Sequence, residues 1–88
     1  MDRSKPDIIG SSVARLLREK REALGLSMNA VAGKAGLSHS MVSRVEGELR
    51  KPTLDTLLRI TGAMRIDLWS LIKQAEMNVP GTKKNKKS

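Results

Sequence analysis

The chain has 88 residues, which is enough for one compact domain and too few for a second. It contains no cysteine, which excludes disulfides and thiolate metal sites and favours a reducing, cytoplasmic setting. Seventeen lysines and arginines against nine acidic residues give a net charge of +8, which favours a polyanionic partner. Half of this excess comes from the four lysines at positions 83, 84, 86 and 87.

The N-terminal residues show no sign of a leader or a membrane anchor. Their longest apolar run is Ile8-Ile9, and no stretch of the chain approaches the ~18 apolar residues of a membrane span. We therefore expect a soluble protein that is not exported. Residues 1–10 have charges, a proline and no sustained period, so they are predicted to be a flexible lead-in.

The composition of the apolar residues favours an all-α fold. Trp69 is the only aromatic residue, so the core must be built from Leu, Val, Ile, Met and Ala. From Ser11 the apolar positions follow helical spacing and end at Gly25, which predicts a first helix with an inward face of Val13, Leu16, Leu17 and Leu24.

Two short helices are predicted next, separated by a tight turn. Ser27 stands at an N-cap position, and Gly36 ends the helix whose inward residues are Met28, Val31, Ala32 and Ala35. Ser38 caps the following helix, His39 to Glu46, in which Val42 and Val45 point inward. The two caps are eleven positions apart, which leaves about three connecting residues and predicts a helix-turn-helix.

The C-terminal part predicts two more helices, capped by Thr53 and Asp67. The fourth has an apolar stripe of Leu54, Leu57, Leu58 and Thr61 or Met64, and the fifth has an inward set of Leu68, Leu71, Ile72 and Ala75. Residues 11–78 then form one domain, and residues 79–88 form a disordered basic tail. Two interpretations of Trp69 are open, a surface residue and a core residue.

The segment LSMNAVAGKAGLSHSMVSRVE, residues 26–46, resembles the DNA-binding segment of the phage-repressor and Cro-like family, the XRE-type regulators. The flanking segments LLREKREALG and RKPTLDTLLRITGAMRIDLWSLI resemble the first helix and the last two helices of that family. The resemblance implies a compact five-helix, lambda-repressor-like domain whose third helix enters the major groove of operator DNA.

Carried over by position, the resemblance implies that bases are contacted by His39, Ser40 and Arg44, with Ser43 nearby. Arg44 is the strongest candidate, because a guanidinium can pair with guanine through two hydrogen bonds. His39 and the two serines have the alternative of ordinary solvated helix positions. Phosphate contacts are expected from helix N-termini and basic side chains, namely Ser27, Asn29, Lys34, Ser38, Arg50 and Lys51. Each of these cations has the alternative of a plain surface charge.

The chain departs from the family pattern at two positions. Met28 stands where the family often has a phosphate-binding glutamine, and Glu48 stands where the family favours glycine. Arg21 and Glu46 match a family ion pair between the first and third helices, with two independent surface charges as the alternative. A homodimer is expected, with an interface of Leu68, Trp69, Ile72 and Met77.

These features predict a sequence-specific transcriptional regulator, a repressor, that binds operator DNA as a dimer. No catalytic, metal-ligand or cofactor motif is present, and no small-molecule pocket is indicated, so we expect neither an enzyme nor a cofactor. One alternative is an antitoxin or another protein-interaction module built on the same helices. Another is non-specific nucleic-acid binding by the lysine tail.

Overall fold

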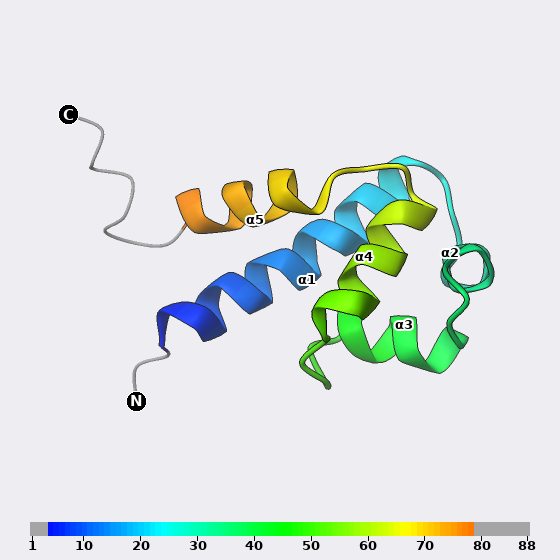
Figure 1. Ribbon diagram of the computed structural model, residues 1–88, viewed down its shortest axis with the longest axis horizontal. Coiled ribbons are helices and arrows are strands. Elements are labelled where there is room, and N and C mark those ends of the chain that lie inside the picture. The colour runs from blue at the N-terminus through cyan, green and yellow to red at the C-terminus, as the bar shows by residue number, and fades with distance from the viewer. Residues whose placement is uncertain (1–3, 79–88) are drawn as a thin grey trace.

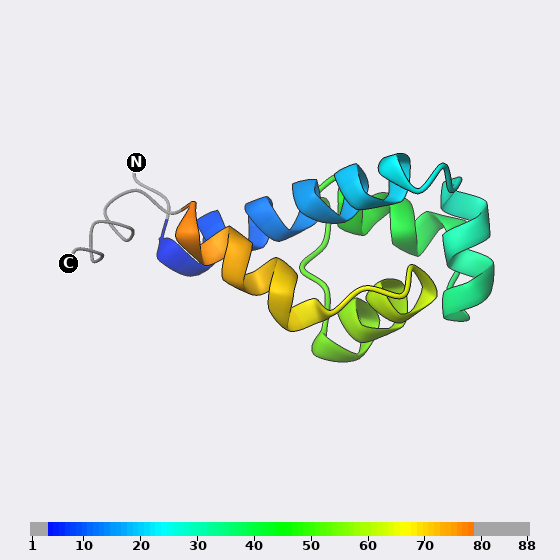
Figure 2. The ribbon, with the colours of Figure 1, turned by 90° about the horizontal axis from the view of Figure 1, so that it is seen from above.

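The computed structural model describes residues 4–78, which contain five α-helices and no strand (Figure 1). The helices are α1 (Lys5–Ala23), α2 (Met28–Ala35), α3 (His39–Glu46), α4 (Leu54–Ala63) and α5 (Leu68–Met77). Figures 1 and 2 show α5 beside the N-terminal half of α1, running in the opposite direction. At the other end of the molecule, α2 packs against both α3 and α4. The all-α, five-helix prediction is confirmed.

The N-caps follow the sequence at three helices. The hydroxyls of Ser27, Ser38 and Thr53 each accept a hydrogen bond from the backbone N–H three residues on, at 3.0, 3.0 and 3.1 Å. Asp67 occupies the N-cap position of α5, but its side chain makes no capping hydrogen bond. Gly36, Leu37 and Ser38 alone connect α2 to α3, as the spacing of the caps predicted.

The first helix begins earlier than the sequence suggested. Ser4 caps α1, accepting a hydrogen bond from the Asp7 N–H at 3.3 Å, and Pro6 lies in the first turn, where no N–H is required. Residues 5–10 are therefore helical, which corrects the expectation of a flexible lead-in over that range. Ile9 packs against the core, and this tertiary contact is not visible in a two-residue apolar run. Residues 1–3 and the expected tail, residues 79–88, lie outside the described residues.

The core takes one or more residues from every helix. The largest fully buried apolar side chains are Leu17, Val31, Val42, Val45, Ile60 and Leu71, each at most 1% exposed. Three leucines predicted to face inward, Leu24, Leu54 and Leu58, are instead more than half exposed. The helix α4 turns Ile60 and Thr61 inward, together with Met64 at its C-cap, which leaves the Leu54 and Leu58 face in solvent. The buried Thr61 hydroxyl is satisfied by the Leu57 carbonyl at 3.0 Å.

A buried ion pair joins α1 to the end of α3. Arg21 Nε donates to Glu46 Oε2 at 2.7 Å and Arg21 Nη2 donates to Glu46 Oε1 at 3.0 Å, while Nη1 donates to the Leu26 carbonyl at 2.8 Å. Both residues are less than 10% exposed. The hydrogen bond to Glu46 raises the pKa of Arg21 against the opposing effect of burial. The pairing thus favours the charged form of the guanidinium in the folded protein. The ion pair thus fixes α1, the end of α3 and the segment before α2 relative to one another.

The first four helices end in the same way, with a residue of positive φ after the last turn. These residues are Gly25, Gly36, Glu48 and Arg65, with φ angles of 72°, 71°, 60° and 57°. At each end the next residue donates its N–H to the carbonyl five positions back, as in a Schellman motif. Glycine adopts this conformation freely, whereas a residue with a Cβ is disfavoured by about 1–2 kcal/mol. Glu48 therefore occupies a position suited to glycine.

Removing one member of the buried pair should destabilise the protein strongly. Glu46→Gln removes the buried counter-ion of Arg21 and leaves only the exposed Glu22 carboxylate, 3.9 Å from Nη2, which costs about 3 kcal/mol of the free energy of unfolding. The matched control is Glu19→Gln, because Glu19 forms an exposed pair with Arg15 at 3.3 Å, and its loss should cost below ~0.5 kcal/mol. Urea unfolding of both variants measures the difference, and equal losses would contradict a structural role for the buried pair.

Inside a helix an alanine variant is usually more stable than a glycine variant, and the positive φ at Glu48 predicts the opposite order there. Glu48→Gly and Glu48→Ala both remove the carboxylate, but only glycine relieves the positive φ, so the glycine variant should be more stable by about 1 kcal/mol. At Glu19, inside α1, the same two substitutions should rank in the opposite order by about 1 kcal/mol. Thermal unfolding of the four variants tests this, and alanine matching glycine at position 48 would show that the backbone there is relaxed.

Candidate nucleic-acid interface

The helix α3 has one buried face and one polar face in solvent. Val42 and Val45 are at most 1% exposed, which fixes the side of the helix that meets the core. On the outer side His39, Ser40 and Arg44 are exposed and Ser43 is half-buried. Their spacing places the four on one stripe of the helix. Figure 1 shows α3 at the lower edge of the molecule, beside the loop of residues 47–53.

The first turn of α2 supplies the next group of candidates. Ser27 and Asn29 are exposed at the start of this helix, which packs against α3. Ser38 is exposed at the start of α3, where it acts as the cap. Free N–H groups and the positive end of the dipole at a helix N-terminus favour an anion. Met28 packs against the core rather than extending outward, so this chain places an apolar contact where the family often has glutamine.

The α3–α4 loop carries both signs of charge, and two contacts tie it to α1. Lys51 Nζ lies 3.1 Å from the Asp7 carboxylate, and the Ser11 hydroxyl donates to Glu48 Oε1 at 2.5 Å. The carboxylate of Glu48 is therefore held against α1. Arg50 is exposed and makes no ion pair within residues 4–78. Of the two loop cations, Arg50 is the one whose charge is not already partnered by a described residue.

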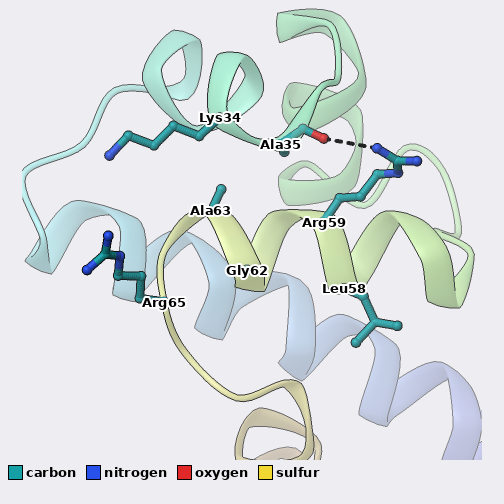
Figure 3. Close-up of a pocket in the computed structure, with 7 residues that line it drawn as sticks. All are labelled: Lys34, Ala35, Leu58, Arg59, Gly62, Ala63 and Arg65. Atoms are coloured by element: carbon teal, nitrogen blue, oxygen red, sulfur yellow. Dashed lines mark hydrogen bonds between the residues drawn. The ribbon is translucent and has the colours of Figure 1, made fainter.

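Lys34 lies apart from the loop, on a shallow pocket of about 450 Å³ between α2 and α4 (Figure 3). Lys34 and Arg65 lie at one end of this pocket and Arg59 lies at the other. Arg59 pairs with Asp55 at 2.8 Å, and its Nη1 donates to the Ala35 carbonyl at 3.5 Å, so it interacts with the C-terminal end of α2.

The role of Arg59 could not be read from the sequence. Asp55 and Arg59 are visible in the sequence as an i, i+4 pair, which is typical of an exposed helix face. The contact with α2 is tertiary and leaves no local signal. A side chain at Gly36 would meet Arg59 Nη1 at 3.4 Å, so the arginine also packs closely against the turn between α2 and α3.

The residues expected at a dimer interface divide into two groups. Leu68 is buried, at 8% exposed, and Ile72 packs against the core, so neither lies free on the surface. Leu68 is a core residue because α5 turns Leu68, Leu71 and Ala75 inward together. Trp69 and Met77 are 67% and 58% exposed, which settles Trp69 as a surface residue. Leu49, Leu54 and Leu58 are further exposed apolar residues that the sequence analysis did not single out as surface.

The described residues offer little else for chemistry. Across residues 4–78, no group of three or more His, Cys, Asp or Glu side chains is arranged to hold a metal ion. No helix in that range has both the length and the apolar character needed to cross a membrane.

Comparison with known proteins agrees with this geometry. Residues 17–68 match the model of a helix-turn-helix family. An uncharacterized HTH-type transcriptional regulator of Mycobacterium tuberculosis, found in two strains, is 36% identical over 64 residues, which cover 73% of this chain and 46% of the relative. A protein of the same description from Sinorhizobium fredii is 32% identical over 76 residues, which cover 86% of this chain and 94% of the relative.

The chain thus spans about half the length of the mycobacterial relatives and nearly all of the Sinorhizobium one. The matched region runs from the middle of α1 to the first residue of α5 and includes both helices of the motif. This chain belongs to the XRE-type helix-turn-helix family.

Proposed function

We propose that this protein is a sequence-specific DNA-binding transcriptional regulator, and that it represses by occupying its operator. The observation that carries the proposal is the outward polar stripe of α3, which is backed by two buried valines. A helix of this kind fits the major groove, where its N-terminal half meets base edges. Membership of the family and the description of the relatives support the coarser part of the proposal, a DNA-binding transcriptional regulator.

Within this proposal each candidate has a specific role. Arg44 pairs with a guanine through its guanidinium, and His39 and Ser40 contact neighbouring base edges from the first turn of α3. Ser43 is half-buried and contributes at the edge of the contact. Phosphate contacts position the domain without specifying sequence. We assign them to Ser27, Asn29, Lys34, Ser38, Arg50 and Lys51.

Dimerisation completes the proposal, because one recognition helix contacts only a few base pairs. Two copies on half-sites about one helical turn apart would contact enough bases for an operator. We assign the interface to α5, where Trp69 and Met77 are exposed apolar residues. An aromatic residue of this size is a common anchor at the centre of protein interfaces.

Replacing Arg44 should separate specific from non-specific binding. Arg44→Ala should weaken binding to a selected operator about 10- to 100-fold, because a bidentate contact with guanine contributes about 1–3 kcal/mol. Its effect on a random duplex should be much smaller. The matched control is Arg18→Ala, because Arg18 is an exposed cation on α1 whose partner is Glu22, and this change should affect both duplexes little. Fluorescence anisotropy measures all four affinities, and equal losses on both duplexes for Arg44→Ala would make Arg44 a phosphate contact.

Replacing Trp69 should weaken self-association. Trp69→Ser should raise the dimer dissociation constant at least tenfold. The affinity for an operator with two half-sites should also fall, because the two DNA-binding domains are no longer joined in one dimer. The control is Leu49→Ser, which removes an apolar side chain that is 80% exposed in the α3–α4 loop. Analytical ultracentrifugation gives the constants. A wild-type chain that stays monomeric with and without operator would contradict the dimer and favour a module that binds a different protein through Trp69.

A further inference from the structure

A second hollow lies away from the α3 surface, between the N-terminal half of α1, the α3–α4 loop and α5. Its volume is about 580 Å³, which is within the ~300–1,000 Å³ typical of small-molecule sites. The sequence analysis indicated no such pocket, because residues 5–10 were not expected to be helical. We call this hollow the α1–α5 groove. Its apolar floor is formed by Ile9, Val13, Leu57 and Ile72, above the buried Leu17 and Val45.

The rim of the α1–α5 groove is charged. On one side two contacts connect α1 to the loop, between Asp7 and Lys51 and between Ser11 and Glu48. Arg50 also lines the groove from the loop, and Glu76 lines it from α5. Neither Arg50 nor Glu76 forms an ion pair within residues 4–78. The groove therefore combines an apolar floor with a few polar groups, as ligand sites do.

The size of the α1–α5 groove suits a small molecule. A volume of about 580 Å³ can hold a compact organic molecule as a whole. A compact apolar body can cover the floor without displacing either contact between α1 and the loop.

The charge of the rim favours a cationic head group. Asp7 pairs with Lys51, whereas Glu48 accepts a hydrogen bond from the neutral hydroxyl of Ser11 and forms no ion pair within residues 4–78. Glu48 and Glu76 then outweigh Arg50 by one negative charge. An ammonium group at this rim gains from the two carboxylates, whereas a carboxylate is repelled by them.

We infer that the α1–α5 groove binds a small amphipathic cation, with its apolar body on the Ile9–Ile72 floor and its ammonium group at Glu48 and Glu76. Glu48 belongs to the loop that also carries Arg50 and Lys51. If the proposed function holds, on which this step rests, neutralising Glu48 removes a repulsion between the loop and DNA phosphates. The bound cation then raises the affinity for DNA, which is the behaviour of a corepressor.

Three probes with one apolar body test the site directly in the absence of DNA. These are 4-phenylbutylamine, 4-phenylbutanol and 5-phenylvalerate, which share a phenylbutyl body and carry a cationic, a neutral and an anionic head group. Titration followed by protein NMR should give the tightest binding for the amine and the weakest for the acid, with shifts confined to the residues that line the groove and their neighbours in the chain. Tightest binding of the acid, or shifts elsewhere, would overturn the assignment.

Two variants connect this binding to the groove. Gly10 lines the groove, and a Cβ there meets no atom within 4 Å, so Gly10→Leu adds a side chain at the groove without a clash and should weaken the amine at least tenfold. Gly62→Leu is the matched control, because Gly62 is equally open but lies on α4 away from the groove, and it should leave binding unchanged. Glu76→Gln should reduce the preference for amine over alcohol. Unchanged binding in Gly10→Leu would overturn the site.

The effect on DNA is measured separately, so that the two proposals fail independently. Saturating amine should raise the affinity for a selected operator several-fold in the wild type and have no effect in Gly10→Leu. Ligand binding that leaves DNA affinity unchanged would overturn the corepressor role, whereas the site itself depends only on the titrations without DNA.

Discussion

The buried ion pair between Arg21 and Glu46 is the constraint on which the rest of this structure depends. One guanidinium donates to both oxygens of a carboxylate at the end of α3 and to the Leu26 carbonyl before α2. Two charges at this depth are stable only together, so α1, α3 and the segment leading into α2 cannot shift independently. The buried Val42 and Val45 fix the rotation of α3 about its axis. Together with the ion pair, they determine which side chains of α3 face outward.

A second and weaker set of contacts positions the loop after α3. Ser11 and Asp7, on the N-terminal half of α1, bind Glu48 and Lys51, and all four side chains are at least partly in solvent. Such exposed contacts contribute under ~1 kcal/mol each. The positive φ at Glu48 further weakens the hold on the loop, because it raises the energy of the loop in its present conformation. The loop is therefore the part of the candidate interface whose position is least strongly fixed, and it is also the part that borders the α1–α5 groove.

The sequence predicted the features that depend on local chemistry. Ser27, Ser38 and Thr53 are residue types that favour N-caps, and Gly25 and Gly36 are typical of helix ends. The apolar periods of α2, α3 and α5 predict the residues that are buried. The sequence could not predict features that depend on a neighbour. The exposed faces of Leu24, Leu54 and Leu58 and the contact between Arg59 and α2 arise from packing. Glu48 and Arg65 are the sharpest cases, because neither residue type signals a positive φ. The early start of α1 is different, because the Ser4 cap and Pro6 in the first turn are local signals that were visible in the sequence.

The central claim is that the outer face of α3 recognises specific bases in double-stranded DNA. Selection of bound duplexes from a random pool, at physiological salt, tests it without knowledge of the operator. The account predicts enrichment of one sequence with two inverted half-sites whose centres lie about one helical turn apart. Recovery of duplexes with no shared sequence would show that binding is only to the phosphate backbone, and would contradict the account.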